Sequence, residues 1–278
     1  MAQAAAKTGI MPTALVAVEQ TFPPDQRVLN DRLAYQMLPP VAKLFVRLLR
    51  WQRLRDGLIN LSEKSQRGIW GGMLCRKRYI DEQLTVAASR ISAIVNLGAG
   101  FDTRLYRIPI ITGIPAWEVD QAVNIEAKKE RLCKALGTIP AQVHLVAVDF
   151  DKEDTATVLA ANGYPMGTPT FFICAAVTQY LTPAGLQQLF GFLSGAAPGS
   201  RLVFSYVRAD FFEGKEMCGW EAGYKRFVVT GIWLSAMEPE GMPSFLSGYG
   251  WRIIEHVGYD ELADRYLRPT HRGLTSTQ

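Results

Sequence analysis

The chain has 278 residues, of which 48% are hydrophobic and 20% are charged, and its formal net charge is +4. This composition excludes an intrinsically disordered chain and provides enough apolar side chains for one large domain. The basic residues are scattered along the chain, which disfavours a dedicated nucleic-acid-binding protein, so we expect no nucleic-acid partner.

The chain begins with a helical region, from Thr13 to about Arg90, in which apolar residues recur at helical spacing. A basic amphipathic helix within it could lie on an anionic membrane surface. More often such a helix is a lid whose apolar face packs on the core, and we favour that interpretation. The helix interleaves Lys43, Arg47, Arg50, Arg53 and Arg55 with Leu44, Phe45, Leu48, Leu49, Trp51 and Leu54.

Between Ile91 and Val207, short apolar runs alternate with amphipathic stretches that have the helical period. This alternation predicts an α/β domain with a parallel sheet and right-handed crossovers. The five expected strands are residues 93–97, 116–119, 143–148, 170–175 and 201–207.

The remaining chain is rich in glycine and aromatic residues and contains one further predicted strand, Trp251–Val257. We therefore expect a Rossmann-like sheet with an N-terminal helical cap and a C-terminal cap insertion. The predicted divisions are residues 1–90 for the helical cap, 91–208 for the core, 209–248 for the cap insertion, and 249–278 for the C-terminal strand of the core and the tail.

The four cysteines lie far apart, with no C-x-x-C pair and no histidine nearby. We interpret them as reduced thiols, and we expect no metal site and no disulfide framework. No uninterrupted apolar stretch reaches about 18 residues, and the first twenty residues lack the pattern of a secretory signal. These observations predict a cytoplasmic globular protein.

The strongest local signal is Gly98-Ala99-Gly100, where the first core strand ends. Two glycines one residue apart let the backbone approach a ligand that any Cβ would touch. By itself this pattern is weak evidence for a ligand site, because many strand-to-helix turns need a glycine.

Asp120 ends the next strand about twenty residues later, where its carboxylate can accept hydrogen bonds from both ribose hydroxyls of a nucleoside. Together the two signals predict a nucleoside site.

Two features distinguish between the possible nucleosides. A dinucleotide site has a third glycine where this chain has Thr103, so the pattern does not favour NAD. The third strand ends at Asp149 and Phe150, a carboxylate for the exocyclic amine of adenine beside an aromatic ring for its face. The sequence therefore favours an adenosyl compound at the carboxyl edge of the sheet.

With these motifs, the sequence resembles the leucine carboxyl methyltransferase family, in its bacterial branch of S-adenosylmethionine-dependent methyltransferases. The similarity covers roughly residues 13–270 and consists of six motifs in order. They are R-x-R-x-x-D at Arg76–Asp81, L-G-A-G-x-D-T-R at Leu97–Arg104, E-V-D at Glu118–Asp120, V-D-x at Val148–Phe150, V-x-x-Y-L-T-P at Val177–Pro183 and R-Y-L-R-P at Arg265–Pro269.

The resemblance implies a class I methyltransferase fold with S-adenosylmethionine as the cofactor. It implies that the two glycines lie under the methionine part, Asp120 at the ribose, Asp149 at the adenine and Arg76 at the cofactor's carboxylate. A guanidinium can bind a carboxylate in a bidentate way, although the pattern alone would make Arg76 part of a solvated basic helix. The expected cofactor-binding residues are Arg76, Gly98, Ala99, Gly100, Asp102, Asp120, Asp149 and Phe150.

Two departures from the family pattern matter. Ala175 stands where the family usually has a glutamate near the methyl group and the acceptor. Relatives also usually end with a strand that closes the sheet, whereas Gly273–Gln278 is too polar and too short for one. We expect either a truncated end or a sheet without its last member.

Methyl transfer from a sulfonium is an in-line displacement that mainly requires the acceptor oxygen to be held in place. A carboxylate acceptor is already ionised at pH 7, whereas a hydroxyl benefits from a base, and no histidine lies in a motif. We therefore expect a small apolar or aromatic acceptor with a carboxylate, oriented by Tyr180 and Tyr206 as the catalytic residues. Large apolar residues of the cap insertion could line the acceptor pocket, although packing within the core of the cap is at least as well supported for most of them. They are Phe211, Phe212, Trp220, Tyr224, Phe227, Trp233 and Phe245.

Three alternatives stay open at this point. The acceptor could be a hydroxyl of secondary or lipid metabolism. The chain could bind S-adenosylmethionine without catalysis, as Ala175 suggests. A nucleotide-dependent oxidoreductase is the third alternative, and both Thr103 and Asp149 argue against it. The sequence does not determine the oligomeric state.

Overall fold

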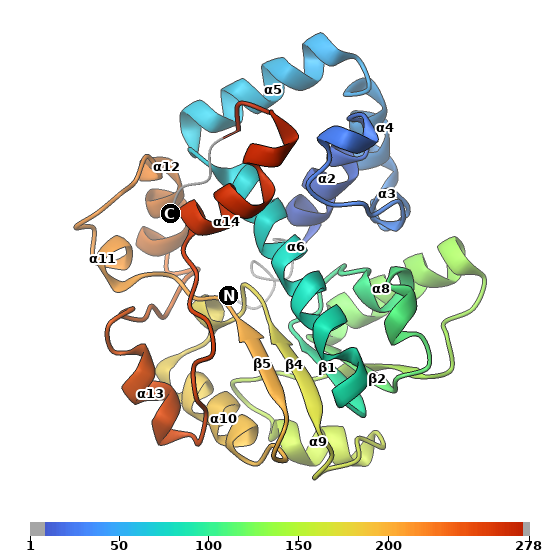
Figure 1. Ribbon diagram of the computed structural model, residues 1–278, viewed down its shortest axis with the longest axis vertical. Coiled ribbons are helices and arrows are strands. Elements are labelled where there is room, and N and C mark those ends of the chain that lie inside the picture. The colour runs from blue at the N-terminus through green and yellow to red at the C-terminus, as the bar shows by residue number, and fades with distance from the viewer. Residues whose placement is uncertain (1–8, 275–278) are drawn as a thin grey trace.

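The computed structural model describes residues 9–274, and a five-stranded parallel sheet forms its centre (Figure 1). The strand order is β3-β2-β1-β4-β5, with every pairing parallel. The strands are β1 (Ala93–Leu97), β2 (Ala116–Asp120), β3 (Val143–Ala147), β4 (Thr170–Cys174) and β5 (Arg201–Phe204). The α/β class is confirmed, and each of the five strands lies where the apolar runs predicted it.

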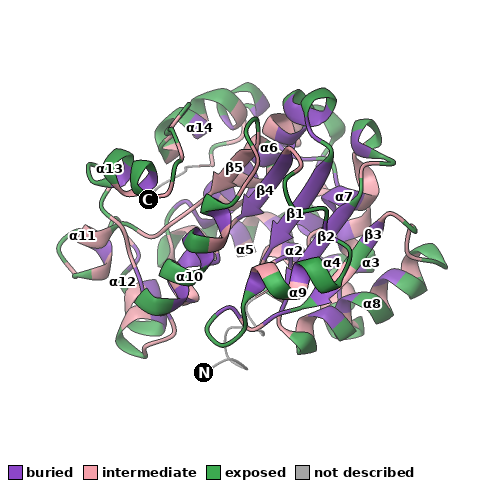
Figure 2. Cartoon of the chain, turned by 90° about the horizontal axis from the view of Figure 1, so that it is seen from below, coloured by how far each residue is buried: buried purple, intermediate pink, exposed green. Residues whose placement is uncertain are grey.

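Strands β1, β2 and β4 are buried along their whole length, whereas β5 is half-buried throughout (Figure 2). A strand covered on both faces has no polar side to alternate with, so its sequence is a continuous apolar run. Side chains with odd numbers in β1 pack against α9, α10 and α13, and Ile94 packs against α6. The sheet is therefore the middle of three layers.

Helices surround the sheet and extend beyond its carboxyl edge as a cap (Figure 1). Those of the core are α6 (Ile69–Ala87), α7 (Arg104–Arg107), α8 (Ala122–Leu136), α9 (Thr155–Ala161) and α10 (Pro183–Ser194). Those before it are α2 (Ile10–Glu19), α3 (Leu33–Gln36), α4 (Pro40–Leu48) and α5 (Gln52–Ser65). Those after it are α11 (Ala209–Phe212), α12 (Glu221–Gly223), α13 (Met242–Gly248) and α14 (Tyr259–Tyr266), with a π-helix at Tyr224–Val229. Within residues 9–274, no helix is both long and apolar enough to span a membrane.

The N-terminal helices and the region after β5 share one apolar core within the cap. Phe211, Trp220, Phe227 and Trp233 are buried in it, and Phe227 stacks on Trp233 with ring centroids 4.8 Å apart. Of the two interpretations that the sequence left open for these four side chains, the structure supports packing within the core of the cap. Their large apolar surfaces join the two cap segments.

The predicted strand at 251–257 is absent. The segment runs beside β5 in the same direction, from Trp251 near Phe172 to His256 beside Tyr206, yet it makes no ladder with β5 (Figure 1). Apolar residues alternate in the sequence of this segment because every second side chain packs inward, since Trp251 and Ile253 contact the apolar cluster below the sheet. Residues 275–278, the end of the predicted tail, lie outside the described residues.

The basic amphipathic stretch does pack on the cap core, but not through most of the apolar side chains that the sequence analysis named for it. The stretch forms two helices, α4 and α5, and most of its large apolar side chains face solvent. Only Leu49, among the apolar residues named for it, is buried. The body of the protein is covered by a different stripe, which includes Val46 and Ile59.

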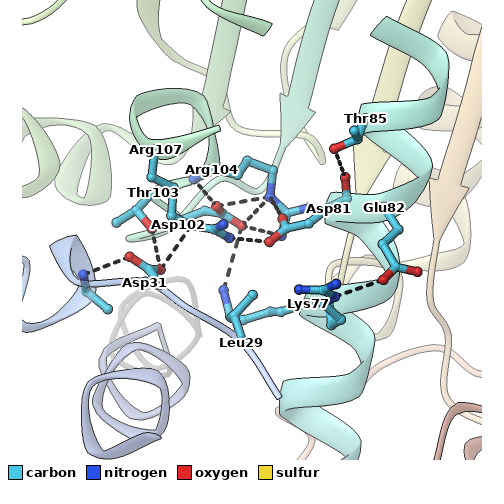
Figure 3. A network of polar contacts seen from close by, with 12 residues as sticks. Leu29, Asp31, Lys77, Asp81, Glu82, Thr85, Asp102, Thr103, Arg104 and Arg107 are labelled. Carbon is cyan, nitrogen blue, oxygen red and sulfur yellow. Dashed lines mark hydrogen bonds and ion pairs between the residues drawn. The ribbon is translucent and has the colours of Figure 1, made fainter. Parts of the chain in front are cut away.

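A buried network of alternating charges joins the cap, α6 and the loop after β1 (Figure 3). Arg104 pairs with Asp102 at 2.8 Å and with Asp81 at 3.7 Å, and its side chain is 1% exposed. Lys77 lies 3.7 Å from Asp102. Three carboxylates and three cations meet here: Asp31, Asp81, Asp102, Lys77, Arg104 and Arg107.

The network is balanced in charge, which offsets the cost of removing its members from water. Burial alone would raise the pKa of Asp102, but Arg104 and Lys77 beside it hold that pKa well below its usual value. Burial lowers the pKa of Lys77. Asp102 therefore remains ionised and fixes the loop that follows β1.

Replacing Arg104 should leave two buried carboxylates without their shared cation. We expect Arg104→Met to lower the free energy of unfolding by about 3–5 kcal/mol. Arg78→Met is the matched control, because Arg78 forms an exposed pair with Glu82 that contributes at most about 1 kcal/mol. Urea unfolding at pH 7 measures both variants. Equal losses in the two variants would contradict a stabilising network.

The same network predicts how the free energy of unfolding falls at acid pH. A carboxyl group whose pKa is depressed by folding contributes stability above its unfolded pKa, about 3.9, and this contribution is lost as pH falls through the folded pKa. The difference in the free energy of unfolding between the wild type and Arg104→Met should therefore become smaller below about pH 4.

Candidate cofactor and acceptor site

The two glycines after β1 both have left-handed backbone, with φ of +67° at Gly98 and +46° at Gly100. A Cβ at Gly98 would lie 2.2 Å from Cγ2 of Val177, whereas a Cβ at Gly100 would meet nothing within 4 Å. Gly98 is therefore required by the packing of the loop after β4 as well as by its backbone. The space over Gly100 is open, as a ligand approaching this turn would need.

Asp120, at the end of β2, holds the turn from the opposite side. One carboxylate oxygen accepts the Gly100 N–H at 2.6 Å, and the other accepts from the N–H of Gln121 and from Nδ2 of Asn124, both at 2.7 Å. A carboxylate offers about four acceptor positions, so it can hold the turn and still accept from a ligand hydroxyl. The structure brings Gly98, Gly100 and Asp120 together, as the motif spacing predicted.

Ala99 and Asp102 fix the same turn within the protein. The N–H of Ala99 donates to the Val119 carbonyl at 3.0 Å. Both oxygens of Asp102 accept from Nε of Arg104, at 3.1 and 3.0 Å. Asp102 is thus engaged by the buried network, which supports the turn from behind.

The third strand ends beside the second, because the N–H of Val148 donates to the Asp120 carbonyl at 2.9 Å. Asp149 follows directly, with its carboxylate 2.8 Å from Nζ of Lys152 and its side chain 32% exposed. Phe150 is buried in the apolar cluster under the sheet. Asp149 is within reach of solvent at this edge, whereas Phe150 presents little of its ring there.

The loop after β4 connects the glycine turn to β5. Ala176 has a left-handed φ of +56°, which is unusual for a residue with a Cβ and typical of sites under functional constraint. Its N–H donates to Oγ of Ser205 at 2.9 Å, and the next residue, Val177, packs on Gly98. Ala175, where the family glutamate was expected, is half-buried against the cluster under α6.

A groove of about 790 Å³ is lined by β5, residues 251–258 and α6. Its walls are mainly apolar, with Val203, Phe204 and Ile253 among them. Arg76 also lines this groove. Nη2 of Arg76 donates to Sδ of Met73 at 3.0 Å, while its Nε is buried without a hydrogen-bond partner in the described part of the chain.

Tyr206 lines the same groove, and its hydroxyl forms a 2.8 Å hydrogen bond with Nε2 of His256. Burial raises the pKa of Tyr206, so the hydroxyl remains protonated at neutral pH. Tyr180 lies apart, in the 3₁₀ turn at Thr178–Tyr180, half-buried against the cap core. From the sequence, His256 lies in no motif and a structural role is expected for it, whereas the structure places it in the groove beside Tyr206.

The predicted site residues therefore fall into two groups. The glycine turn, Asp120 and Asp149 occupy the carboxyl ends of β1, β2 and β3. Arg76 and Tyr206 line the groove beside β5, and no hydrogen bond or ion pair between residues 9 and 274 joins Arg76 to Gly98, Gly100 or Asp120. The loop at 175–177 bridges the two groups. No cluster of three or more metal-binding side chains occurs within residues 9–274.

Comparison with known proteins identifies the chain's family. The model of the family described as leucine carboxyl methyltransferase matches residues 9–194, which is more than half of the chain. The chain belongs to this family. The assignment agrees with the motifs and with the parallel sheet that carries them.

Two mycobacterial relatives extend the likeness over most of the chain. A protein of Mycobacterium marinum is 33% identical over 250 residues, covering 85% of this chain and 80% of the relative. A protein of Mycobacterium avium is 30% identical over 257 residues, covering 87% of this chain and 82% of the relative. Both are named "putative S-adenosyl-L-methionine-dependent methyltransferase".

Solved structures support the fold alone. A "putative methyltransferase" of Thermobifida fusca has a TM-score of 0.50 at 16% identity, covering 87% of this chain and 91% of that one. A DUF574 family protein of Streptomyces avermitilis has a TM-score of 0.51 at 12% identity, covering 78% of this chain and 80% of that one. As a member of the leucine carboxyl methyltransferase family with this sheet, the chain is an S-adenosylmethionine-dependent methyltransferase.

The residues present fit this cofactor. The turn at Gly98–Gly100 is open above Gly100, and an acidic side chain stands at the end of the neighbouring strand. Thr103, at the third glycine position of a dinucleotide site, uses its hydroxyl to donate to Asp31 at 2.5 Å. The side chain of Thr103 occupies the space that the third glycine of a dinucleotide site leaves free, so a pyrophosphate cannot come as close to the backbone here.

The two glycines should respond differently to alanine. Gly98→Ala adds a Cβ against Val177, so we expect a loss of both stability and cofactor affinity. Gly100→Ala meets no atom within 4 Å, so its structural cost should be limited to the left-handed backbone, about 1 kcal/mol. Val177→Ala should partly rescue the stability of Gly98→Ala and not that of Gly100→Ala. Thermal melts of the four variants test this, and equal rescue would contradict the packing argument.

Proposed function

We propose that this methyltransferase acts on an oxygen of a small apolar or aromatic acceptor, and that this oxygen belongs to a carboxylate. The observation that carries the proposal is the apolar groove beside β5, which contains Arg76 and Tyr206 and adjoins the loop at 175–177. An apolar cleft with a few convergent polar groups is the usual form of a small-molecule site.

In this proposal the glycine turn and Asp120 hold the nucleoside part of S-adenosylmethionine. Asp149 would accept from the adenine amine beside Phe150, and Arg76 would bind the carboxylate of the methionine part. Arg76 suits that role because no carboxylate in the described chain pairs with it. When bound, the cofactor supplies an electrophilic methyl group on sulfur.

The protein's main contribution is then to hold the acceptor oxygen in line with that methyl group, within about 3–3.5 Å. Tyr206 can donate its hydroxyl proton to one oxygen of an acceptor carboxylate and leave the other oxygen free to react. Its raised pKa keeps it a donor at neutral pH. Tyr180 would act from the cap side, and the vacancy left by Ala175 would be filled by acceptor or water.

A hydroxyl acceptor is the second candidate, and the Tyr206–His256 pair favours it. A histidine hydrogen-bonded to a tyrosine could take up the proton that a hydroxyl must lose. A carboxylate acceptor needs no such base. The pH dependence of the reaction therefore distinguishes the two candidates.

Cofactor affinity should depend on Asp120. Hydrogen bonds to charged groups contribute roughly 1.5–3 kcal/mol each, so Asp120→Ala should weaken binding about ten- to a thousandfold. Asp120→Asn should weaken it less, since one acceptor oxygen remains. Asp154→Ala, which removes an exposed helix cap at α9, is the control and should bind normally. Calorimetric titration with S-adenosylhomocysteine measures all three.

Unchanged affinity in Asp120→Ala would place the cofactor elsewhere. Asp120 also supports the fold, since its carboxylate accepts three hydrogen bonds and the residue is 8% exposed. Some loss of stability is therefore expected, and the titration should be run well below the melting temperature of the variant.

The acceptor class should appear in the pH profile. On a good carboxylate substrate, kcat should stay nearly flat from about pH 6.5 to 9, because no enzyme base must lose a proton. Tyr206→Phe should lower kcat with little change in cofactor affinity, and Tyr180→Phe should do the same to a smaller extent. His256→Gln should keep the flat profile.

A steep rise with pH that His256→Gln abolishes would establish the hydroxyl alternative. Screening apolar carboxylic acids and phenols for uptake of a labelled methyl group supplies the substrate. Binding of the cofactor without methyl transfer to any member of either class would favour the non-catalytic alternative that Ala175 suggested.

A further inference from the structure

We propose that the outer face of α4 and α5 binds the surface of a membrane that contains anionic lipid. This inference does not depend on the acceptor, since the two helices lie at the outer end of the cap, away from the sheet (Figure 1). The face consists of Val41, Leu44, Phe45, Leu48, Trp51 and Leu54, hereafter the α4–α5 patch.

The α4–α5 patch is exposed to an unusual degree for side chains of this size. Its six members are between 46% and 81% exposed, and Trp51, the largest of them, is 69% exposed. Single exposed apolar side chains are common on protein surfaces, but a group of large ones marks an interaction site.

The helical period explains why these side chains face outward together. Val41, Leu44, Phe45 and Leu48 follow the spacing of one helix stripe. A second stripe packs inward, since Val46 in α4 is buried in the cap core. The inward stripe already attaches the helix to the protein, so the outward stripe is not needed to hold the fold together.

The charged side chains within the patch segment are cations, and the carboxylate that follows it, Asp56, pairs with Arg55 at 3.3 Å. From residue 32 to residue 55 the chain has six cations and no carboxylate. Arg47, Arg50 and Arg53 are exposed among the apolar side chains, and Lys43 is half-exposed. Arg55 differs from them, because it is buried, stacks on Phe22 and donates to the Thr21 carbonyl at 3.1 Å.

This combination matches an anionic lipid surface better than it matches another protein copy. Trp, Phe and Leu side chains can enter the boundary between headgroups and acyl chains, while Arg side chains reach the phosphates. In a symmetric contact between two copies, each patch would face an identical set of exposed arginines, and the neighbouring carboxylate, Asp56, already pairs with Arg55 of its own copy. Self-association through this face is therefore disfavoured.

Sedimentation of the full chain with lipid vesicles tests the proposal. We expect binding to vesicles of phosphatidylcholine mixed with phosphatidylglycerol, and at least tenfold weaker binding to phosphatidylcholine alone. Binding should fall as salt is raised, because the Debye length shortens. The double variant Phe45→Ala/Trp51→Ala should bind the mixed vesicles at least tenfold more weakly than the wild type.

The charge contribution is tested separately. Arg47→Glu/Arg50→Glu should lose binding to the mixed vesicles, whereas Lys129→Glu, which changes an exposed cation on α8, should not. Val123→Ala/Val229→Ala removes exposed apolar groups elsewhere and should bind as the wild type does. All substituted patch residues are exposed, so circular dichroism should show intact folding.

Two outcomes would overturn the proposal. One is equal loss of binding in the patch variants and in the controls. The other is a wild type that does not bind vesicles but forms a dimer in analytical ultracentrifugation that Phe45→Ala/Trp51→Ala converts to a monomer. That result would make the patch a contact between copies. Neither outcome bears on cofactor binding or on the methyl acceptor.

Discussion

The buried charges around Arg104 hold the site together. Arg104 bridges Asp81 on α6 and Asp102 in the loop after β1, and Arg107 extends the chain of charges to Asp31 before α3. The position of the loop relative to the helix is thereby fixed from behind. Because the glycine turn lies two residues before Asp102, the backbone that we propose to face the cofactor is supported by ion pairs behind it.

This arrangement gives the family motifs a physical meaning. The last residues of the motif at Leu97–Arg104 and of the motif at Arg76–Asp81 meet each other in the network. The motif at Glu118–Asp120 contributes a second buried pair, since Glu118 lies 2.7 Å from Lys128 on α8. Burial raises the pKa of Glu118, and Lys128 opposes that shift. Much of what the motifs encode is the support of the site.

The sequence predicted the sheet well because buried parallel strands have continuous apolar runs, as in Ala93–Leu97 and Thr170–Cys174. It failed at Trp251–Val257, where the apolar alternation reflects packing without hydrogen bonding to β5. Periodicity reports which side chains are buried and says nothing of where the backbone groups pair. The spacing of Gly98, Gly100 and Asp120 could be predicted for the same reason as the strands, since parallel strands end at one edge.

Other features depend on tertiary contacts that no local pattern contains. The Tyr206–His256 pair joins residues fifty positions apart. The sequence left open whether the aromatic residues after β5 line a pocket or pack in the cap core, and the structure buries Trp220 and Trp233 with the N-terminal helices. In α4, the sequence has two apolar stripes and cannot indicate which one packs inward. The structure resolves these choices by burying Val46 and leaving Leu44 and Phe45 exposed.

A crystal structure of the complex with S-adenosylhomocysteine tests the central claim most directly. We expect the ligand to lie over Gly100, with the ribose hydroxyls donating to the Asp120 carboxylate and the adenine amine near Asp149. Its sulfur should point toward the loop at 175–177 and the groove that contains Tyr206. A ligand bound without contact to Asp120, or bound wholly within the groove beside β5, would contradict the account.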